Sequence, residues 1–182
     1  MVEIRWHGRG GQGAFTAARL LGVAVTLFED RYALAFPSFG PERRGSPVLG
    51  FTRIDNCKIA DRSIITDCDV VIILDDTLLD DSVLNGLRRG GLLLVNTAHG
   101  ELPIRPPDYV RTVLVDATSL AMQYLGRPIT NTALLGALAA SSDIVRIHSL
   151  IAAIRAEMKG TSAEKNVALL EAAYNVYGGN IA

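Results

Sequence analysis

The chain of 182 residues has few cysteines and few aromatic residues, and both shortages restrict what it can be. Its two cysteines, Cys57 and Cys68, form no C-x-x-C pair and belong to no Cys/His cluster. The sequence therefore offers no ligand set for an iron–sulfur cluster or a zinc ion, and free thiols in a reducing compartment are expected. Aromatic residues make up only 6% of the chain, so leucine, isoleucine, valine and alanine must build the core.

The sequence also lacks an excess of charge and any long apolar run. Its formal net charge of −1 argues against nucleic acid or an anionic membrane as a partner. No apolar stretch approaches the ~20 residues needed to cross a bilayer, and residues 1–6 have no signal-peptide profile. We expect a soluble, cytoplasmic protein with one domain spanning residues 1–182, since 49% of the residues are apolar.

Short β-branched runs predict strands that are buried on both faces. Three uncharged runs of this kind lie at residues 70–74, 92–95 and 113–115. A crossover helix over residues 77–89 would join the first two of them in parallel. Further strands are expected at residues 2–7, 31–36 and 48–54, with a short antiparallel piece at 58–65.

Other segments carry apolar residues three and four apart, which is typical of amphipathic helices. Thr161 and Glu164 have the spacing of a capping box before the last of these segments. The pattern predicts a three-layer α/β/α sandwich with a mostly parallel, mixed sheet, Rossmann-like, and a helical C-terminal part. Helices are expected at about residues 14–28, 117–125, 132–141, 149–158 and 163–177.

A glycine-rich loop follows the first predicted strand and precedes the first predicted helix. Its glycines allow a tight turn and the close approach of a ligand, while free N–H groups and the helix dipole attract an anion. The loop therefore favours a phosphate or pyrophosphate ligand, and a tight turn without a ligand is the alternative. The motif has the form G-x-G-x-x-G and consists of Gly8, Arg9, Gly10, Gly11, Gln12 and Gly13.

The surroundings of this motif disfavour a nicotinamide dinucleotide. Its ribose needs a carboxylate about twenty residues further on, at the carboxyl end of the second strand. Glu29 and Asp30 have nearly that spacing but precede the predicted strand, and its far end at residues 36–38 has no carboxylate. A stand-alone nucleotide-dependent oxidoreductase is therefore kept only as a rival hypothesis.

The loop at residues 36–47 is a second candidate for binding an anion. Arg43 and Arg44 are adjacent, and a guanidinium is a rigid bidentate donor to phosphate or carboxylate. In a doubly wound fold this loop can lie near the glycine loop, so the two could form one anion site, although a solvated Ω-loop is the alternative. Asn131, just before a predicted helix, is either a helix cap or a ligand contact.

No residues have the arrangement of a nucleophile and its base, so the sequence predicts neither a catalytic residue nor a metal ligand in this chain. His7 ends the first predicted strand, and we expect a packed side chain there rather than a ligand contact.

These loops resemble the gamma subunits of pyruvate and related 2-oxoacid:ferredoxin oxidoreductases. The resemblance is strongest at residues 6–14, W-H-G-R-G-G-Q-G-A, and at residues 36–48, F-P-S-F-G-P-E-R-R-G-S-P-V. It extends over nearly the whole chain, because weaker matching stretches lie at residues 69–75, 90–92 with 96–97, 115–118, and 131 with 135–138.

The resemblance implies a multi-subunit enzyme of anaerobic metabolism that decarboxylates a 2-oxoacid on thiamine diphosphate. It implies that electrons pass through iron–sulfur clusters to ferredoxin, and that the acyl group goes to coenzyme A (CoA). Thiamine diphosphate, magnesium and the clusters would belong to alpha, beta and delta-type partner subunits, while the gamma chain is associated with CoA binding and assembly.

The same resemblance assigns the loop from Gly8 to Gly13 to the phosphates of CoA, with Arg43 and Arg44 pairing with the remaining phosphate charge. The loop around these arginines looks closer to the pyruvate or branched-chain type than to the 2-oxoglutarate type. An isolated chain could form a homodimer. The alternatives are a non-catalytic adaptor without a ligand, and the small subunit of an indolepyruvate-type ferredoxin oxidoreductase.

Overall fold

The computed structural model describes residues 1–38 and 45–178, which form a six-stranded sheet, five α-helices and two short 3₁₀ helices. The strands are β1 Val2–Arg9, β2 Tyr32–Pro37, β3 Pro47–Asp55, β4 Cys68–Ile73, β5 Leu87–Asn96 and β6 Arg111–Val115. The helices are α1 Ala14–Phe28, α2 Ala117–Leu125, α3 Asn131–Ser141, α4 Ile147–Glu157 and α5 Gly160–Gly178, with the 3₁₀ helices η1 Asp76–Leu78 and η2 Asp81–Leu84.

The sheet is mixed, with the strand order β2-β3-β1-β4-β5-β6. Strands β1, β4, β5 and β6 are parallel, whereas β3 runs antiparallel to both β1 and β2. The carboxyl ends of the parallel strands therefore meet at one edge of the sheet, where the glycine loop leaves β1. The predicted α/β fold with a mixed sheet and a helical C-terminal part is confirmed.

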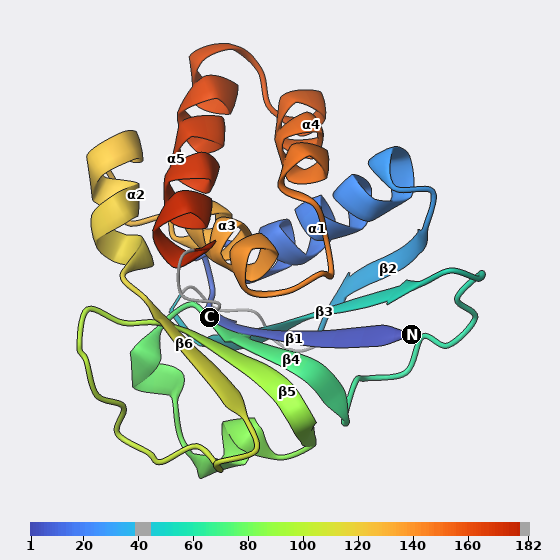
Figure 1. Cartoon of the computed structure of the whole chain (residues 1–182), viewed down its shortest axis with the longest axis vertical. Helices are drawn as coiled ribbons and strands as arrows, with labels where there is room; N and C mark the ends of the chain where they lie inside the picture. The colour runs from blue at the N-terminus through green and yellow to red at the C-terminus, as the bar shows by residue number, and fades with distance from the viewer. Residues whose placement is uncertain (39–44, 179–182) are drawn as a thin grey trace.

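All five α-helices lie on one face of the sheet (Figure 1). Side chains alternate along a strand, so Ile4 and Trp6 of β1 point into the core under the helices. Helix α3 is buried at every residue because it packs between the sheet and α5. The predicted inner face of α1, with Ala17 and Leu20 among its residues, is buried as expected.

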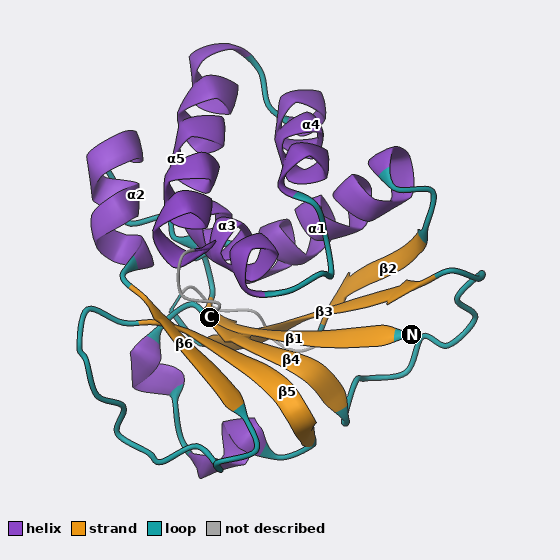
Figure 2. Ribbon diagram, viewed as in Figure 1, coloured by secondary structure: helices purple, strands orange, loops and turns teal. Residues whose placement is uncertain are grey.

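The opposite face is covered by loops and the 3₁₀ helices (Figure 2), so among the described residues the second α-helical layer of the predicted three-layer α/β/α sandwich does not form. The predicted helix over residues 77–89 is wrong, since that segment holds η1, η2 and the start of β5. Asp75 accepts a hydrogen bond from the Thr77 N–H at 3.1 Å, and Asp80 accepts from Ser82 N at 2.8 Å. Such local side-chain bonds favour short turns over a continuous helix.

Two smaller predictions are also wrong. No strand forms at residues 58–65. The Arg53 guanidinium donates to the carbonyl oxygen of Ser63 at 2.8 Å, whereas in a strand that carbonyl would accept from the backbone of a neighbouring strand. Helix α5 begins at Gly160, before the proposed capping box, and Glu164 accepts from the Arg155 side chain at 3.3 Å. Among the described residues, no helix is long and apolar enough to cross a membrane.

Candidate functional site

The glycine loop turns the chain from β1 into α1. Gly11 and Gly13 have φ angles of +95° and +84°, a region that favours glycine, and Gly13 is the N-cap of α1. A Cβ on Gly8 would come within 3.3 Å of the Ala14 Cβ, so that glycine permits the close approach of strand and helix. The predicted tight turn between strand and helix is confirmed.

Three side chains fix the shape of this loop. The Arg9 N–H donates to Gln12 Oε1 at 2.7 Å, and Gln12 Nε2 donates to Asp75 Oδ2 at 2.9 Å. The Arg9 Nε donates to the same Asp75 oxygen at 3.0 Å. Burial raises the pKa of the Asp75 carboxyl, but hydrogen bonds from Thr77 and Gln12 and the Arg9 charge outweigh it and lower the pKa overall. Arg9 and Gln12 thus hold an ionised Asp75 after β4.

The end of the basic loop lies against the glycine loop, as predicted. Gly10 N donates to Ser46 O at 2.9 Å, and Gly45 N donates to Gly10 O at 3.2 Å. Arg43 and Arg44 immediately precede Gly45 in the sequence but lie outside the described residues. Their predicted role at the site stays a prediction.

Within the described residues, no acidic side chain compensates the partial positive charge at the N-terminus of α1. Gly13 provides no side-chain cap, and the first turn of the helix contains no acidic residue. The first N–H groups of an α-helix have no acceptor inside the helix, and the helix dipole adds partial positive charge there. This combination suits an anion.

Asn131 lies beside this helix start. It is 5% exposed, it is the first residue of α3, and Thr130 occupies the N-cap position. Its Nδ2 lies 3.5 Å from Gly13 O, and a Cβ on Gly13 would come within 2.7 Å of the same nitrogen. The first turn of α3 also lacks acidic residues. The fold thus brings the N-terminal ends of two helices together. Asn131 is the first residue of α3 rather than its N-cap, although its Oδ1 accepts from the Thr132 N–H at 2.9 Å, and its role as a ligand contact stays a prediction.

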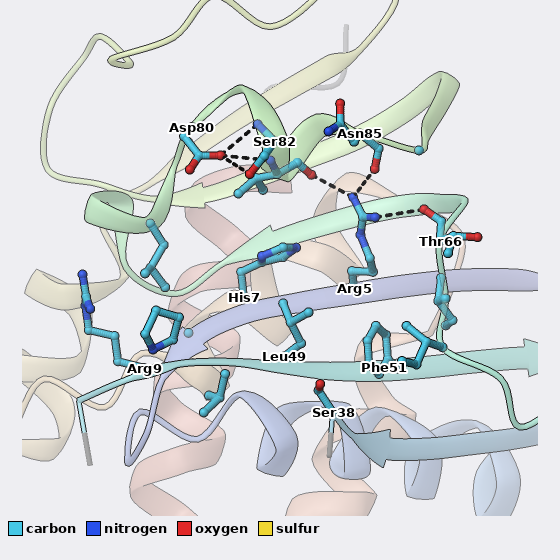
Figure 3. Close-up of a pocket in the computed structure, with 18 of the residues that line it drawn as sticks. Arg5, His7, Arg9, Ser38, Leu49, Phe51, Thr66, Asp80, Ser82 and Asn85 are labelled. Atoms are coloured by element: carbon cyan, nitrogen blue, oxygen red, sulfur yellow. Dashed lines mark hydrogen bonds between the residues drawn. The ribbon is translucent and has the colours of Figure 1, made fainter. Parts of the chain in front are cut away.

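A wide groove of about 1180 Å³ lies on the sheet face opposite the α-helices; Gly8 is among its lining residues, and Arg9 lies at one end of it (Figure 3). His7 lies inside this groove, where burial and then the Arg5 charge lower its pKa to about 4, against a smaller opposing effect of Asp80. Sequence analysis missed Arg5, although polar residues 5, 7 and 9 alternate with apolar residues 4 and 6 in β1.

The carboxylate of Glu29 serves the fold. It accepts from the backbone N–H of Arg146 at 2.8 Å and so ties the start of α4 to the end of α1. Glu29 follows the far end of α1, a helix of 15 residues that begins at the glycine loop. At 1.5 Å per residue this helix is about 22 Å long, so Glu29 lies far from that loop.

The described residues offer no ribose or metal ligands of the expected kind. The end of β2 at Pro37 and Ser38 has no carboxylate for a ribose, and no group of three or more His, Cys, Asp or Glu side chains could hold a metal.

Comparison with known proteins decides the family. A family model described as "Pyruvate ferredoxin/flavodoxin oxidoreductase" matches residues 3–176. The chain belongs to this family. Two curated relatives are each 46% identical and aligned over 96% of both chains: the "Pyruvate/ketoisovalerate oxidoreductases common subunit gamma" of Thermococcus kodakarensis and the "Pyruvate synthase subunit PorC" of Methanocaldococcus jannaschii.

Solved structures agree with this assignment. The crystal structure of "pyruvate oxidoreductase subunit PORC" from Thermotoga maritima is 34% identical, with a TM-score of 0.83, and the match covers 96% of this chain and 95% of that one. A 2-oxoglutarate:ferredoxin oxidoreductase from Magnetococcus marinus matches over 100% of this chain and 31% of its own, with a TM-score of 0.80. At 15% identity this second likeness shows the fold alone. The predicted membership among the gamma subunits of the family is confirmed, and the chain is an oxidoreductase subunit.

Proposed function

We propose that the chain is the gamma subunit of a cytoplasmic 2-oxoacid:ferredoxin oxidoreductase that acts on pyruvate or a branched-chain 2-oxoacid. In this proposal the enzyme decarboxylates the 2-oxoacid, passes electrons to ferredoxin and forms acyl-CoA, and the gamma subunit contributes CoA binding and assembly. The names of the relatives support the substrate class, because pyruvate and ketoisovalerate appear in them.

The proposal places thiamine diphosphate, magnesium and iron–sulfur clusters in alpha, beta and delta-type partner subunits. Four cysteine thiolates hold the usual cluster, and this chain has two cysteines in all. The described part of the chain contains Cys57 as an exposed thiol and Cys68 as a buried one. The role left for this chain is to bind and orient a substrate and to hold partner subunits.

The observation that carries the CoA assignment is the meeting of two helix N-termini at the glycine loop. CoA carries a diphosphate and a further phosphate, and phosphate groups bind well at such helix ends. Space for the ligand exists beside Gly11, because an added Cβ there would meet no atom of the described residues within 4 Å. Arg43 and Arg44, only two residues and one residue before Gly45, would pair with the remaining phosphate charge.

Calorimetric titration of the assembled enzyme with CoA tests this assignment. The change Phe15→Glu places a carboxylate in the first turn of α1, at a residue that is 40% exposed. We expect CoA to bind at least tenfold more weakly to this variant and to the double variant Arg43→Ala/Arg44→Ala. The matched control Leu27→Glu introduces the same charge near the other end of α1, at a residue that is 63% exposed, and should leave the affinity unchanged. Unaltered CoA affinity in both test variants would reject the site.

The subunit role itself is tested by recovering the tagged chain from its own cells under anaerobic conditions. We expect partner subunits with thiamine-binding and ferredoxin-like sequences, and CoA-dependent oxidation of pyruvate or 2-oxoisovalerate in the eluate. A complex with only two kinds of subunit would favour the indolepyruvate-type enzyme. A solitary chain that binds NAD(H) at micromolar concentration would favour the stand-alone oxidoreductase.

A further inference from the structure

The groove on the sheet face opposite the α-helices has an unusual polar floor. Among the described residues, two buried side-chain nitrogen or oxygen atoms lack a hydrogen-bond partner, the Nε of Arg5 and the Nε2 of His7. Both belong to β1, they are two residues apart, and both line this groove (Figure 3). Buried polar atoms are nearly always paired in folded proteins, so two orphans in one cavity indicate a missing binding partner.

Arg5 carries a buried charge without a counter-ion. It is 9% exposed, and its guanidinium donates to three backbone carbonyl oxygens, those of Thr66, Val83 and Asn85, at 2.7–2.9 Å. No carboxylate of the described residues lies within 4.0 Å of it, whereas Arg53, which is also buried, pairs with two carboxylates. Buried charges in proteins are usually paired, so the Arg5 site favours a carboxylate that the described residues do not supply.

Apolar side chains surround this polar floor. Val48 and Leu49 of β3 are half-buried along one wall, Val83 forms part of the other, and Ile64 at the rim is 60% exposed. The stretch of β1 from Arg5 to Arg9 alone is about 13 Å long at 3.3 Å per residue. The volume of about 1180 Å³ exceeds the roughly 1,000 Å³ upper size of ordinary small-molecule pockets. Polar and apolar side chains line the groove in similar numbers, Asp67 and Asp80 among them, and a groove of this size suits an extended chain.

We propose that this groove receives an extended segment of a partner subunit, with one Asp or Glu carboxylate against Arg5 and His7 and apolar side chains on both sides of it. Both nitrogen atoms are buried, so a small movement of the Arg5 and His7 side chains lets the carboxylate accept from Arg5 Nε and from the Nε2–H tautomer of His7. The apolar neighbours cover Leu49 and Ile64. The inference rests on the proposed function, because it requires partner subunits. It locates one contact of the assembly on the sheet face that has no α-helix.

Co-expression of the chain with its partner subunits tests the inference in the assembled enzyme. A photo-reactive benzoylphenylalanine at Ile64 keeps Arg5 and His7 intact and reports what lies in the groove. We expect it to crosslink to one partner peptide in which an Asp or Glu lies among apolar residues. The same probe at Leu27, on α1, should not yield that peptide.

A charge in the groove provides the matching functional test. Leu49→Glu places a carboxylate in the groove wall and should reduce recovery of the chain in the complex at least tenfold, while Leu27→Glu should reduce it less than twofold. Thermal unfolding of the isolated Leu49→Glu chain, within about two degrees of wild type, separates lost docking from lost folding.

The remaining outcomes overturn the inference. A crosslink to a second copy of the chain, to a partner peptide without an acidic residue, or to nothing in an active complex would each do so. So would Arg5-dependent stabilisation of the isolated chain by inorganic phosphate, if the Ile64 probe gives no partner peptide, because a small anion would then occupy the site. In all these cases an active complex leaves the proposed function intact, whereas failure to form any complex removes both.

Discussion

The two faces of the sheet are covered in different ways. On the helical face, small and branched side chains such as Ala17, Ala137 and Leu170 pack closely, and each helix satisfies its own backbone groups. On the other face, loops and 3₁₀ turns cover the strands, and arginines donate to their backbone carbonyls. A buried loop has no repeating hydrogen-bond pattern, so its carbonyls need donors from side chains. The comparison shows that loops can cover a sheet in place of helices when arginine side chains bond to their backbone carbonyls.

The largest effect is expected where a buried arginine holds the second face. Arg53 is 2% exposed, bonds to Glu3 at 2.9 Å and holds the carbonyl oxygen of Ser63. Breaking such a buried pair destabilises proteins by about 3–5 kcal/mol, so Arg53→Met should cost about 4 kcal/mol in urea unfolding. Arg88→Met is the matched control, since Arg88 bonds to the same Glu3 but is 42% exposed, and it should cost about 1 kcal/mol. Equal losses would show that burial does not matter here.

On the helical face, the position most sensitive to substitution is the contact between α3 and α5. A Cβ on Gly136 of α3 would come within 2.4 Å of the Leu170 carbonyl oxygen in α5. Gly136→Ala should therefore separate two helices and cost about 3 kcal/mol, the upper range for overpacking. Gly90→Ala is the control, because its φ of +79° strains any side chain while an added Cβ meets no atom of the described residues within 4 Å, and about 1 kcal/mol is expected. The free energy of unfolding measures both, and a tolerated Gly136→Ala would contradict close packing of α3 on α5.

The polar floor of the second face should make stability depend on pH. His7 has its pKa lowered to about 4, whereas an unfolded histidine titrates near 6.5. As pH falls below 6.5, the unfolded chain therefore binds a proton before the folded chain does, and stability is lost. Linkage gives a loss of about 2 kcal/mol between pH 7.5 and pH 5. In His7→Gln this loss should disappear from the unfolding curves, and a variant with an unchanged slope would assign the titration to other groups.

Sequence patterns predicted the helical face better than the other face. The bounds of α1 and α2 follow from apolar spacing after a glycine turn and after Asp116, because local signals fix both ends. The segment at residues 77–89 was predicted as a helix, since the bonds that Asp75 and Asp80 make to nearby N–H groups are not visible in apolar spacing.

The candidate site shows the same division. The turn at the glycine loop was predictable because positive φ angles require glycine, whereas the position of Asn131 beside Gly13 depends on contacts across 118 residues. Alternation in β1 indicates that Arg5 faces away from Trp6, but it does not tell which loops Arg5 holds.

The smallest loss of stability is expected from changing a buried hydrogen bond between Trp6 and Thr52 on the helical face. Trp6 Nε1 donates to Thr52 Oγ1 at 3.0 Å, and that hydroxyl lies 3.3 Å from the Ala18 carbonyl oxygen of α1. Thr52→Val preserves the shape but leaves a buried indole N–H without an acceptor, which should cost about 1.5 kcal/mol. Thr52→Ser retains the hydroxyl, loses one methyl group and should cost about 0.8 kcal/mol. Trp6 is the single tryptophan, so its fluorescence reports both unfolding and local polarity. If Thr52→Val lowers the free energy of unfolding less than Thr52→Ser does, the helical face is stabilised by packing alone. It would then differ more strongly from the opposite face, where arginine side chains bond to the loops.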